Sequence, residues 1–243
     1  MCSTCGCGDS HHHHDHDHVR QIDLEKDILD INNHYAQQNR DFLNQRHSIG
    51  FNFVSSPGSG KTTLLEKTIR YLTPQYPIAV IEGDQHTDLD AQRIRQAGAK
   101  ARQINTGKSC HLDAHMVGHA LQELNIGEGG FVFIENVGNL ICPAMFDLGE
   151  HYRVAIISTT EGDDKPLKYP DMFYGADVVI VNKTDLLPYV NFDLECCVEA
   201  IRKISSKAEL FFMSADNLVG VDLWIDWLKN IHLLHGEKPS LSR

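Results

Sequence analysis

Short apolar runs alternate with segments of helical periodicity through most of this chain. Between the runs, Thr62–Leu72 and Leu112–Leu124 repeat apolar residues at helical spacing. Strands that are apolar throughout are buried on both faces, which requires a mostly parallel sheet covered by helices. The pattern therefore predicts an α/β fold, with strands at Phe51–Val54, Ile78–Ile81, Phe131–Ile134, Val154–Ile157, Val178–Val181 and Leu210–Met213.

The segment before the first strand has a looser pattern. Apolar residues recur at roughly helical spacing from Ile22 to Phe42, with polar residues between them. We expect one or two amphipathic helices that pack on the edge of the domain, and we assign them no chemistry.

Composition narrows the classes of function. A formal net charge of −11 argues against nucleic acid as a partner, because phosphates would be repelled. No apolar run is long enough to span a membrane, and the amino terminus does not have the pattern of a signal peptide. Seven cysteines, three of them within the first seven residues, do not suggest a disulfide framework. Thiols in a reducing cytoplasm fit better.

The first predicted strand leads into the stretch Ser-Ser-Pro-Gly-Ser-Gly-Lys-Thr-Thr and then into a helix. This context is typical of a phosphate-binding loop, in which glycines let backbone N–H groups converge on an anion at a helix N-terminus. The stretch has Ser55 where the usual pattern has glycine, and an ordinary glycine-rich turn is the alternative. The expected phosphate-binding residues are Gly58, Ser59, Gly60, Lys61, Thr62 and Thr63.

Acidic residues follow two other predicted strands, at the edge where ligands bind in such sheets. Asp84 and Glu135 could join the Thr62 hydroxyl in holding Mg²⁺. Lys61 would reach the outer phosphates, so Lys61 and Asp84 are the candidate catalytic residues. The N–H of Gly138 could reach a terminal phosphate.

The strand ending at Val181 is followed by Asn182-Lys183-Thr184-Asp185. A carboxylate here would accept two hydrogen bonds from guanine, and adenine has no matching pair of donors, so the expected discrimination is ~10⁴. The alternative is a simple helix cap. With Ser214 and Ala215 near the base oxygen, the expected nucleotide-binding residues here are Asn182, Lys183, Asp185, Ser214 and Ala215.

A further group of residues is not needed for nucleotide binding alone. Cys110 and His111 are adjacent, and Cys142 lies shortly after the Glu135–Gly138 segment. A thiolate–imidazole set suits Ni²⁺ or Zn²⁺, but three ligands per chain fall short of a closed site, and a second chain could complete it. The alternative is buried cysteines and a helix-start histidine. Cys196 and Cys197 fall in a helical pattern and are interpreted as structural.

The amino-terminal residues offer many more metal ligands. Three thiols and the terminal amine left after removal of Met1 form a four-ligand set suited to square-planar nickel, and the imidazoles that follow could bind further ions. A reactive disordered tail and a purification tag are the alternatives. The expected nickel ligands are Cys2, Cys5, Cys7, His11, His12, His13, His14, His16 and His18.

Taken together, these motifs resemble the HypB family, GTPases of the SIMIBI class that assist nickel insertion into [NiFe]-hydrogenase. The resemblance rests on Cys2-x-x-Cys5-Gly6-Cys7, the His-rich tail, Ser55–Thr63, Glu82–Asp84, Cys110–His115, Glu135–Leu140, Cys142-Pro143, Glu161–Lys165 and Asn182–Asp185. It implies a P-loop GTPase fold and a nucleotide-dependent homodimer whose interface carries a metal site at Cys110, His111 and Cys142. It also implies GTP, GDP, Mg²⁺, Ni²⁺ and Zn²⁺ as ligands. The implied protein partners are the zinc protein HypA, a nickel chaperone and the hydrogenase large subunit.

The corresponding organisation is a Cys/His-rich tail at residues 1–18, a helical segment at 19–48, a GTPase domain at 49–235 and a short tail at 236–243. Two other functions compete. A small-molecule kinase or transferase would share the phosphate loop but leave the Asn182–Asp185 motif and the metal ligands unexplained. A nickel storage protein would be supported by the amino-terminal tail alone.

Overall fold

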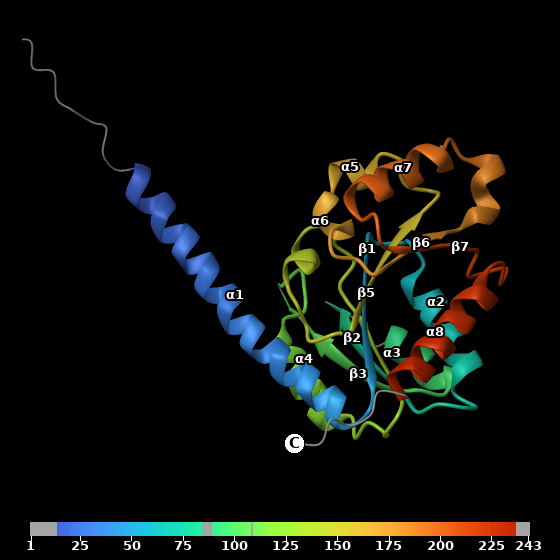
Figure 1. Ribbon diagram of the computed structural model, residues 1–243, viewed down its shortest axis with the longest axis horizontal. Helices are drawn as coiled ribbons and strands as arrows, with labels where there is room; N and C mark the ends of the chain where they lie inside the picture. The colour runs from blue at the N-terminus through green and yellow to red at the C-terminus, as the bar shows by residue number, and fades with distance from the viewer. Residues whose placement is uncertain (1–13, 85–88, 108, 237–243) are drawn as a thin grey trace, which may run out of the picture.

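The computed structural model describes residues 14–84, 89–107 and 109–236, with side chains from residue 26 onward except at Leu89. In this part of the chain, a single seven-stranded sheet has the order β3-β2-β4-β1-β5-β6-β7, and every neighbouring pair is parallel (Figure 1). The predicted α/β fold is confirmed. The strands are β1 Ile49–Ser55, β2 Ile78–Asp84, β3 Lys100–Asn105, β4 Phe131–Glu135, β5 Tyr152–Ser158, β6 Val178–Asn182 and β7 Glu209–Phe212.

Helices connect the strands and cover both faces of the sheet (Figure 1). The longer ones are α1 His14–Gln45, α2 Lys61–Leu72, α3 Leu89–Ala97, α4 Ala114–Glu123, α7 Leu194–Ile204 and α8 Val221–Gly236. The shorter ones are α5 Lys165–Lys168 and α6 Pro170–Phe173, with 3-10 turns η1 Cys142–Met145 and η2 Thr184–Tyr189.

Successive side chains along each strand point to opposite faces of the sheet, so the core has one part on each face. Phe51 and Phe53 of β1 point to one face, where they pack with residues of α2, α3 and α8 such as Leu64 and Trp224. Val54 of the same strand points to the other face, with residues of α6 and α7. A third cluster joins α1 and α4 to β2 and β4 on that second face. The central strands are buried on both sides, as their apolar composition requires.

The amino-terminal region forms one continuous helix, α1, rather than two. Its last turns lie against α4, and its first turns extend away from the domain (Figure 1). Asn39 fixes the contact, since its amide donates to the carbonyl oxygens of Ala114 (2.7 Å) and Leu148 (2.9 Å). Gly149 has a φ of 89°, and a Cβ there would collide with the Ala36 carbonyl, so only glycine allows this close approach.

No described helix is both long and apolar enough to cross a membrane.

Candidate functional site

The phosphate loop connects β1 to α2, and its shape depends on glycine. Gly58 and Gly60 have φ values of 74° and 95°, in the left-handed region that other residues rarely adopt. A Cβ on Gly60 would also collide with the side-chain amide of Asn182. Gly60 is the N-cap of α2, so the loop presents its backbone at the positive end of that helix.

Ser55, which occupies the glycine position of the usual pattern, organises the base of this loop. Its buried hydroxyl accepts hydrogen bonds from Ser59 Oγ (2.6 Å) and Lys61 Nζ (2.8 Å) and donates to the Ser56 carbonyl (2.8 Å). Burial lowers the pKa of Lys61, and the nearby carboxylates of Glu135, Asp90 and Glu161 oppose this effect. The lysine is therefore held inside the loop at the position where phosphate charge would arrive.

The end of β4 provides an acidic group beside the loop. Thr62 Oγ1 donates to Glu135 Oε1 at 2.7 Å. Burial raises the pKa of Glu135, and Lys61 and the Thr62 hydrogen bond partly offset this rise. Among the described residues, Glu135 Oε2 is buried with no hydrogen-bond partner. A hydroxyl and an unpaired carboxylate oxygen are the donors that Mg²⁺ prefers, so these residues fit that ion.

The Asn182–Asp185 motif braces the phosphate loop from the neighbouring strand. Asn182 Nδ2 donates to the Ser59 carbonyl (2.8 Å), and its Oδ1 accepts from the Ala215 N–H (3.1 Å). Lys183, which has a φ of 61°, donates from Nζ to the Gly58 carbonyl at 2.7 Å. Asp185 lies half-buried in η2, just after these braces. The motif therefore has a structural part in addition to its expected contact with a base.

A pocket of about 350 Å³ opens over the loop. Its described lining includes the whole expected phosphate set and Asn182, Lys183, Ala215 and Glu135, but not Asp84, Gly138, Asp185 or Ser214. Asp84 ends β2, and a Cβ on Gly138 would lie 3.1 Å from Pro57 Cα, which places Gly138 against the loop.

Three lining residues were not predicted: Asp90, Arg93 and Asp216. Asp216 directly follows Ser214-Ala215, so its position in the sequence could have indicated it. Asp90 and Arg93 lie on α3, where Arg93 pairs with Glu66 (3.0 Å) and Asp90 (3.4 Å). Polar residues on a short helix give no comparable signal.

The structure brings the three predicted metal ligands of the domain together. Single ligand atoms of Cys110, His111 and Cys142 all lie within 4.8 Å of one another, and each residue is partly exposed. We call these residues the metal triad. Cys110 and His111 precede α4, and Cys142 begins η1, so two separate loops supply the ligands.

Packing and charge shape the metal triad. The His111 ring stacks on Phe146, with centroids 4.1 Å apart and an interplanar angle of 20°. Burial lowers the pKa of His111, and Asp113 opposes this effect. The hydrogen bond that the Cys142 thiol makes to Cys110 raises the pKa of Cys142, as does burial. The imidazole is therefore readily neutral, while a metal must displace the Cys142 proton.

The two cysteines of α7 differ in their burial. Cys197 is buried in the core, and burial raises its thiol pKa to about 12, whereas Cys196 is exposed. The amino-terminal ligands Cys2, Cys5, Cys7, His11, His12 and His13 lie outside the described residues. His14, His16 and His18 fall in α1, where only the backbone is described.

Comparison with known proteins agrees with this geometry. The CobW/HypB/UreG nucleotide-binding domain family matches residues 51–212. The hydrogenase maturation factor HypB of Azotobacter vinelandii is 56% identical over 210 residues, which cover 86% of this chain and 69% of that protein.

Two solved structures are similar in both sequence and fold. HypB from Archaeoglobus fulgidus has a TM-score of 0.79 and 40% identity, covering 84% of this chain and all (100%) of that one. HypB from Helicobacter pylori, solved in complex with nickel, has a TM-score of 0.78 and 35% identity, with 87% and 99% covered. The resemblance inferred from the motifs is confirmed: the chain belongs to the HypB family of hydrogenase maturation factors.

Proposed function

We propose that this protein is a GTP-hydrolysing metallochaperone that binds nickel and assists its delivery into [NiFe]-hydrogenase. One observation carries the proposal: a single domain holds a glycine-shaped loop at the start of α2 and three clustered side chains that could bind a metal, and the end of β4 with the segment after it contributes to both. Glu135 contacts Thr62 of the loop, and Cys142 of the metal triad follows a few residues later. The family of the chain and the nickel complex of the Helicobacter pylori relative support the same function.

The chain's own residues would promote hydrolysis by positioning and by charge. The loop N–H groups and Lys61 would bind the β- and γ-phosphates and stabilise the charge that develops as water attacks the γ-phosphorus. Thr62, Asp84 and Glu135 would hold Mg²⁺, which neutralises phosphate charge when bound. Asp185 would select guanine, and the Gly138 N–H would sense the terminal phosphate. Slow turnover would suit a switch.

The metal triad has the form of an incomplete site. Three partly exposed ligands leave a tetrahedral or square-planar ion without a full set. Exposed apolar side chains flank Cys142, with Ile141 56% and Met145 55% accessible. A second copy that covers these side chains would supply the missing ligands, so we infer that the triad is completed in a nucleotide-dependent homodimer.

The identity of the metal and of the partners completes the proposal. Nickel is the cargo, and zinc would fit the same thiolate–imidazole set. The amino-terminal Cys2, Cys5 and Cys7 and the histidines after them would bind further nickel. The partners would be HypA, a nickel chaperone and the hydrogenase large subunit, and the protein would act in the cytoplasm.

The decisive experiment measures nickel affinity and oligomeric state of the full chain with GDP and with a slowly hydrolysed GTP analogue. Nickel at the metal triad is the part lost in Cys142→Ala, which leaves the amino-terminal ligands in place. We expect the GTP analogue to favour the dimer and to change nickel affinity at the triad. Equal affinity in the two nucleotide states, with no change in mass by light scattering, would contradict the proposal.

A further inference from the structure

A series of hydrogen-bonded polar side chains joins the two loops that carry the metal triad. The same series reaches the nucleotide side of the sheet. It begins at Asn136, the residue after β4, which is 1% exposed. Asn136 Oδ1 accepts from the N–H of Leu112 at 3.1 Å, and Leu112 directly follows His111. The residue before Asn136 in the chain belongs to the nucleotide site, since Glu135 accepts a hydrogen bond from Thr62 of the phosphate loop. Asn136 therefore contacts the first metal loop and adjoins the nucleotide pocket.

The other end of this chain reaches the second metal loop. Asn136 Nδ2 donates to Asn52 Oδ1 (3.4 Å), and Asn52 Nδ2 donates to Glu150 Oε1 (3.0 Å). Arg153 binds the same Glu150 oxygen at 3.1 Å and donates to the carbonyls of Ala144 (2.9 Å) and Phe146 (3.2 Å). Those carbonyls follow Cys142 in the chain.

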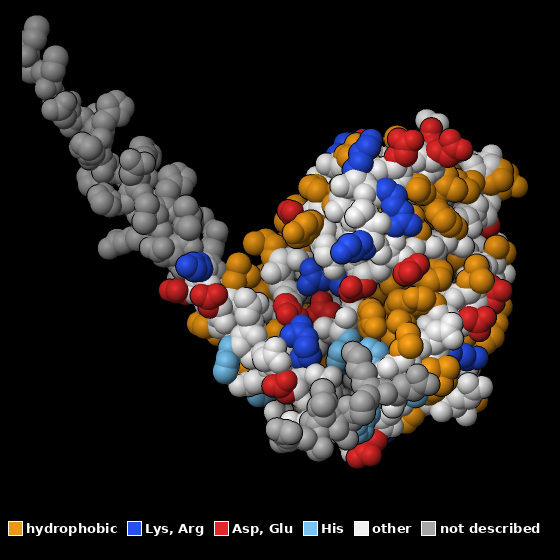
Figure 2. All heavy atoms as spheres, in the orientation of Figure 1, with side chains coloured by type: hydrophobic (Ala, Val, Ile, Leu, Met, Phe, Trp, Pro, Cys, Tyr) orange, Lys and Arg blue, Asp and Glu red, His pale blue; other side chains and the backbone are white. Residues whose placement is uncertain are grey.

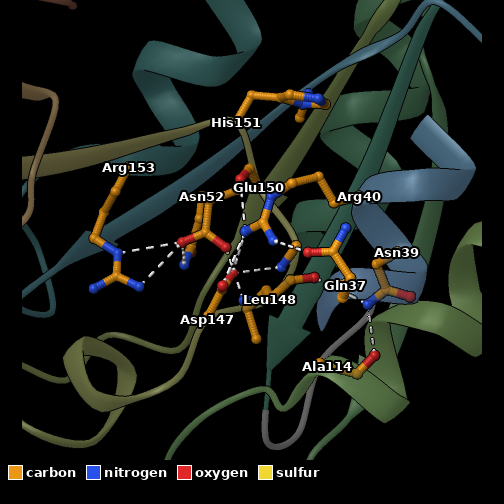
Figure 3. Close-up of polar contacts among 12 residues, drawn as sticks. Gln37, Asn39, Arg40, Asn52, Ala114, Asp147, Leu148, Glu150, His151 and Arg153 are labelled. Atoms are coloured by element: carbon orange, nitrogen blue, oxygen red, sulfur yellow. Dashed lines mark hydrogen bonds and ion pairs between the residues drawn. The ribbon is translucent and has the colours of Figure 1, made fainter. Parts of the chain in front are cut away.

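The side chains that connect Asn136 to the Cys142 loop lie close together. Figure 3 shows Asn52 and Arg153 pointing toward Glu150, with Arg40 reaching Asp147 beside them. Figure 2 shows acidic and basic side chains gathered where α1 meets the domain. Asn52 and Asn136 are almost completely buried, so water cannot replace their hydrogen bonds. A shift at one end must therefore be followed by the next group or leave a buried polar atom unpaired, which is unfavourable.

We propose that Asn136 is the positioning residue that couples the nucleotide site to the metal triad. Its backbone N–H is fixed to the Phe53 carbonyl of β1 (3.1 Å), and its Oδ1 also accepts from the Val137 N–H (3.0 Å). A change in the Glu135–Val137 backbone on γ-phosphate binding turns this side chain. The turn moves the Leu112 N–H, and with it the backbone of His111.

Leu112 is well placed to transmit this movement. Its side chain is completely buried and packs against Gly83, where a Cβ would lie 2.8 Å from Leu112 Cγ. Leu112 therefore cannot turn freely about its own position. Motion of its N–H passes to His111 and changes the geometry of the triad, which alters metal affinity. By linkage, a metal at the triad alters nucleotide affinity by the same factor.

The chain offers a matched control in Asn32 of α1. Asn32 Oδ1 accepts from the Ala114 N–H (2.9 Å), and its Nδ2 donates to the Asp147 carbonyl (2.8 Å). Asn32 therefore holds the backbone of the same two loops and is buried like Asn136, but it lies on α1 and does not line the nucleotide pocket. Loss of either side chain removes similar bonds, but only Asn136 adjoins the nucleotide side.

The test is the ratio of nickel dissociation constants at the triad in GDP and in a slowly hydrolysed GTP analogue. It uses the full chain and nickel alone with a competing chelator. This inference rests on the proposed function, so the wild type must show a ratio different from one; a ratio of one would overturn both. Given a wild-type ratio of several-fold, we expect Asn136→Ala to bring it to within about twofold of one and Asn32→Ala to preserve it. An unchanged ratio in Asn136→Ala would overturn this inference alone.

Two further measurements guard against a general loss of structure. Asn136→Asp keeps the acceptor for the Leu112 and Val137 N–H groups, so it should retain more of the ratio than Asn136→Ala. In the wild type without metal, amide exchange followed by NMR should change several-fold at Leu112 between the nucleotide states. The Ala114 amide, bound by Asn32, should change less. Equal changes at the two amides would contradict the assigned role of Asn136.

Discussion

The nucleotide pocket and the metal triad differ in how deeply their side chains are buried and in how complete their sets of ligands are. In the pocket, Lys61, Glu135 and Asn182 are buried, and each makes hydrogen bonds to other parts of the site. The triad has three partly exposed ligands on two loops, and the described chain supplies no fourth. Binding of a nucleotide requires fixed donors around a highly charged group, which favours burial and preorganisation. Release of a metal requires an open site, which favours exposure and incompleteness.

The two sites meet at the end of β4. The strand that ends in Glu135 is buried inside the sheet, whereas the loop that carries Cys142 follows it and is partly exposed. A nucleotide-dependent change at Glu135 would therefore have only a few residues to cross before it reached Cys142.

The largest effect is expected from Asp185→Asn. If Asp185 accepts the two guanine N–H groups, the variant should change the preference from GTP to xanthosine triphosphate by up to ~10⁴, because xanthine has an acceptor where guanine has an amine. Competition binding of the two nucleotides measures the ratio. Nickel binding at the triad in the absence of nucleotide should be unaffected. A preference for GTP equal to that of the wild type would remove the guanine assignment.

Lys61→Ala tests whether the buried cation of the pocket is catalytic. Removal of one preorganised donor to a developing negative charge typically lowers kcat by ~10²–10³. We expect that loss in GTP hydrolysis, with the nickel capacity of the nucleotide-free protein unchanged. Lys203→Ala, at an exposed position on α7, is the control for removal of a positive charge. Full hydrolysis by Lys61→Ala would show that the pocket acts without this lysine.

Much of the fold and many residues of the two sites could be predicted from the sequence. The phosphate loop, the Asn182–Asp185 motif and the Cys110-His111 pair are local patterns, each formed by neighbours in the chain. The parallel sheet follows from apolar strands separated by helices. The thiol of Cys142 indicates the same metal chemistry as Cys110, although only the order of the strands determines that the two loops meet.

Cys142→Ala tests the open site. Loss of one ligand from an incomplete set should lower nickel affinity at the triad by at least the ~10–100-fold that changes around metal ligands cause. The nucleotide pocket lacks Cys142, so GDP affinity without metal should remain at the wild-type value. Nickel titration with a competing chelator gives the first value and calorimetry the second. A simultaneous loss of GDP affinity would mean that the loop, and not the ligand, was affected.

A smaller effect is expected from Ser55→Ala. The variant removes the buried acceptor of Lys61 and Ser59, which should lower the free energy of unfolding of the nucleotide-free protein by ~1–3 kcal/mol. For a chain of this size, each kcal/mol shifts Tm by roughly 2–4 °C. Ser206→Ala, at an exposed position, should change stability by less than ~0.5 kcal/mol. Equal Tm values for the two variants would show that the Ser55 hydroxyl is not structurally important.

The rest could not be predicted because it depends on contacts between distant segments. Ser55 departs from the usual glycine, and its role is visible only once Lys61 folds back onto it. Asn136 and Asn52 are ordinary polar residues in the sequence, and their hydrogen bond joins positions far apart in the chain. Arg93 reaches the pocket because α3 lies beside α2, where Glu66 holds it. No local pattern indicates such pairings.

The smallest predicted effect concerns the charge of Lys61. Burial lowers its pKa in the nucleotide-free protein from 10.5, so between the lowered pKa and 10.5 the unfolded chain binds more protons than the folded one. The contribution of Lys61 to stability should therefore rise with pH across that window. A bound phosphate restores the charged form, so GDP binding without Mg²⁺ should take up a proton there, and GDP affinity should fall as pH rises. Calorimetry at alkaline pH in buffers of different ionisation enthalpy measures this uptake. Uptake that persists unchanged in Lys61→Met would assign it to another group.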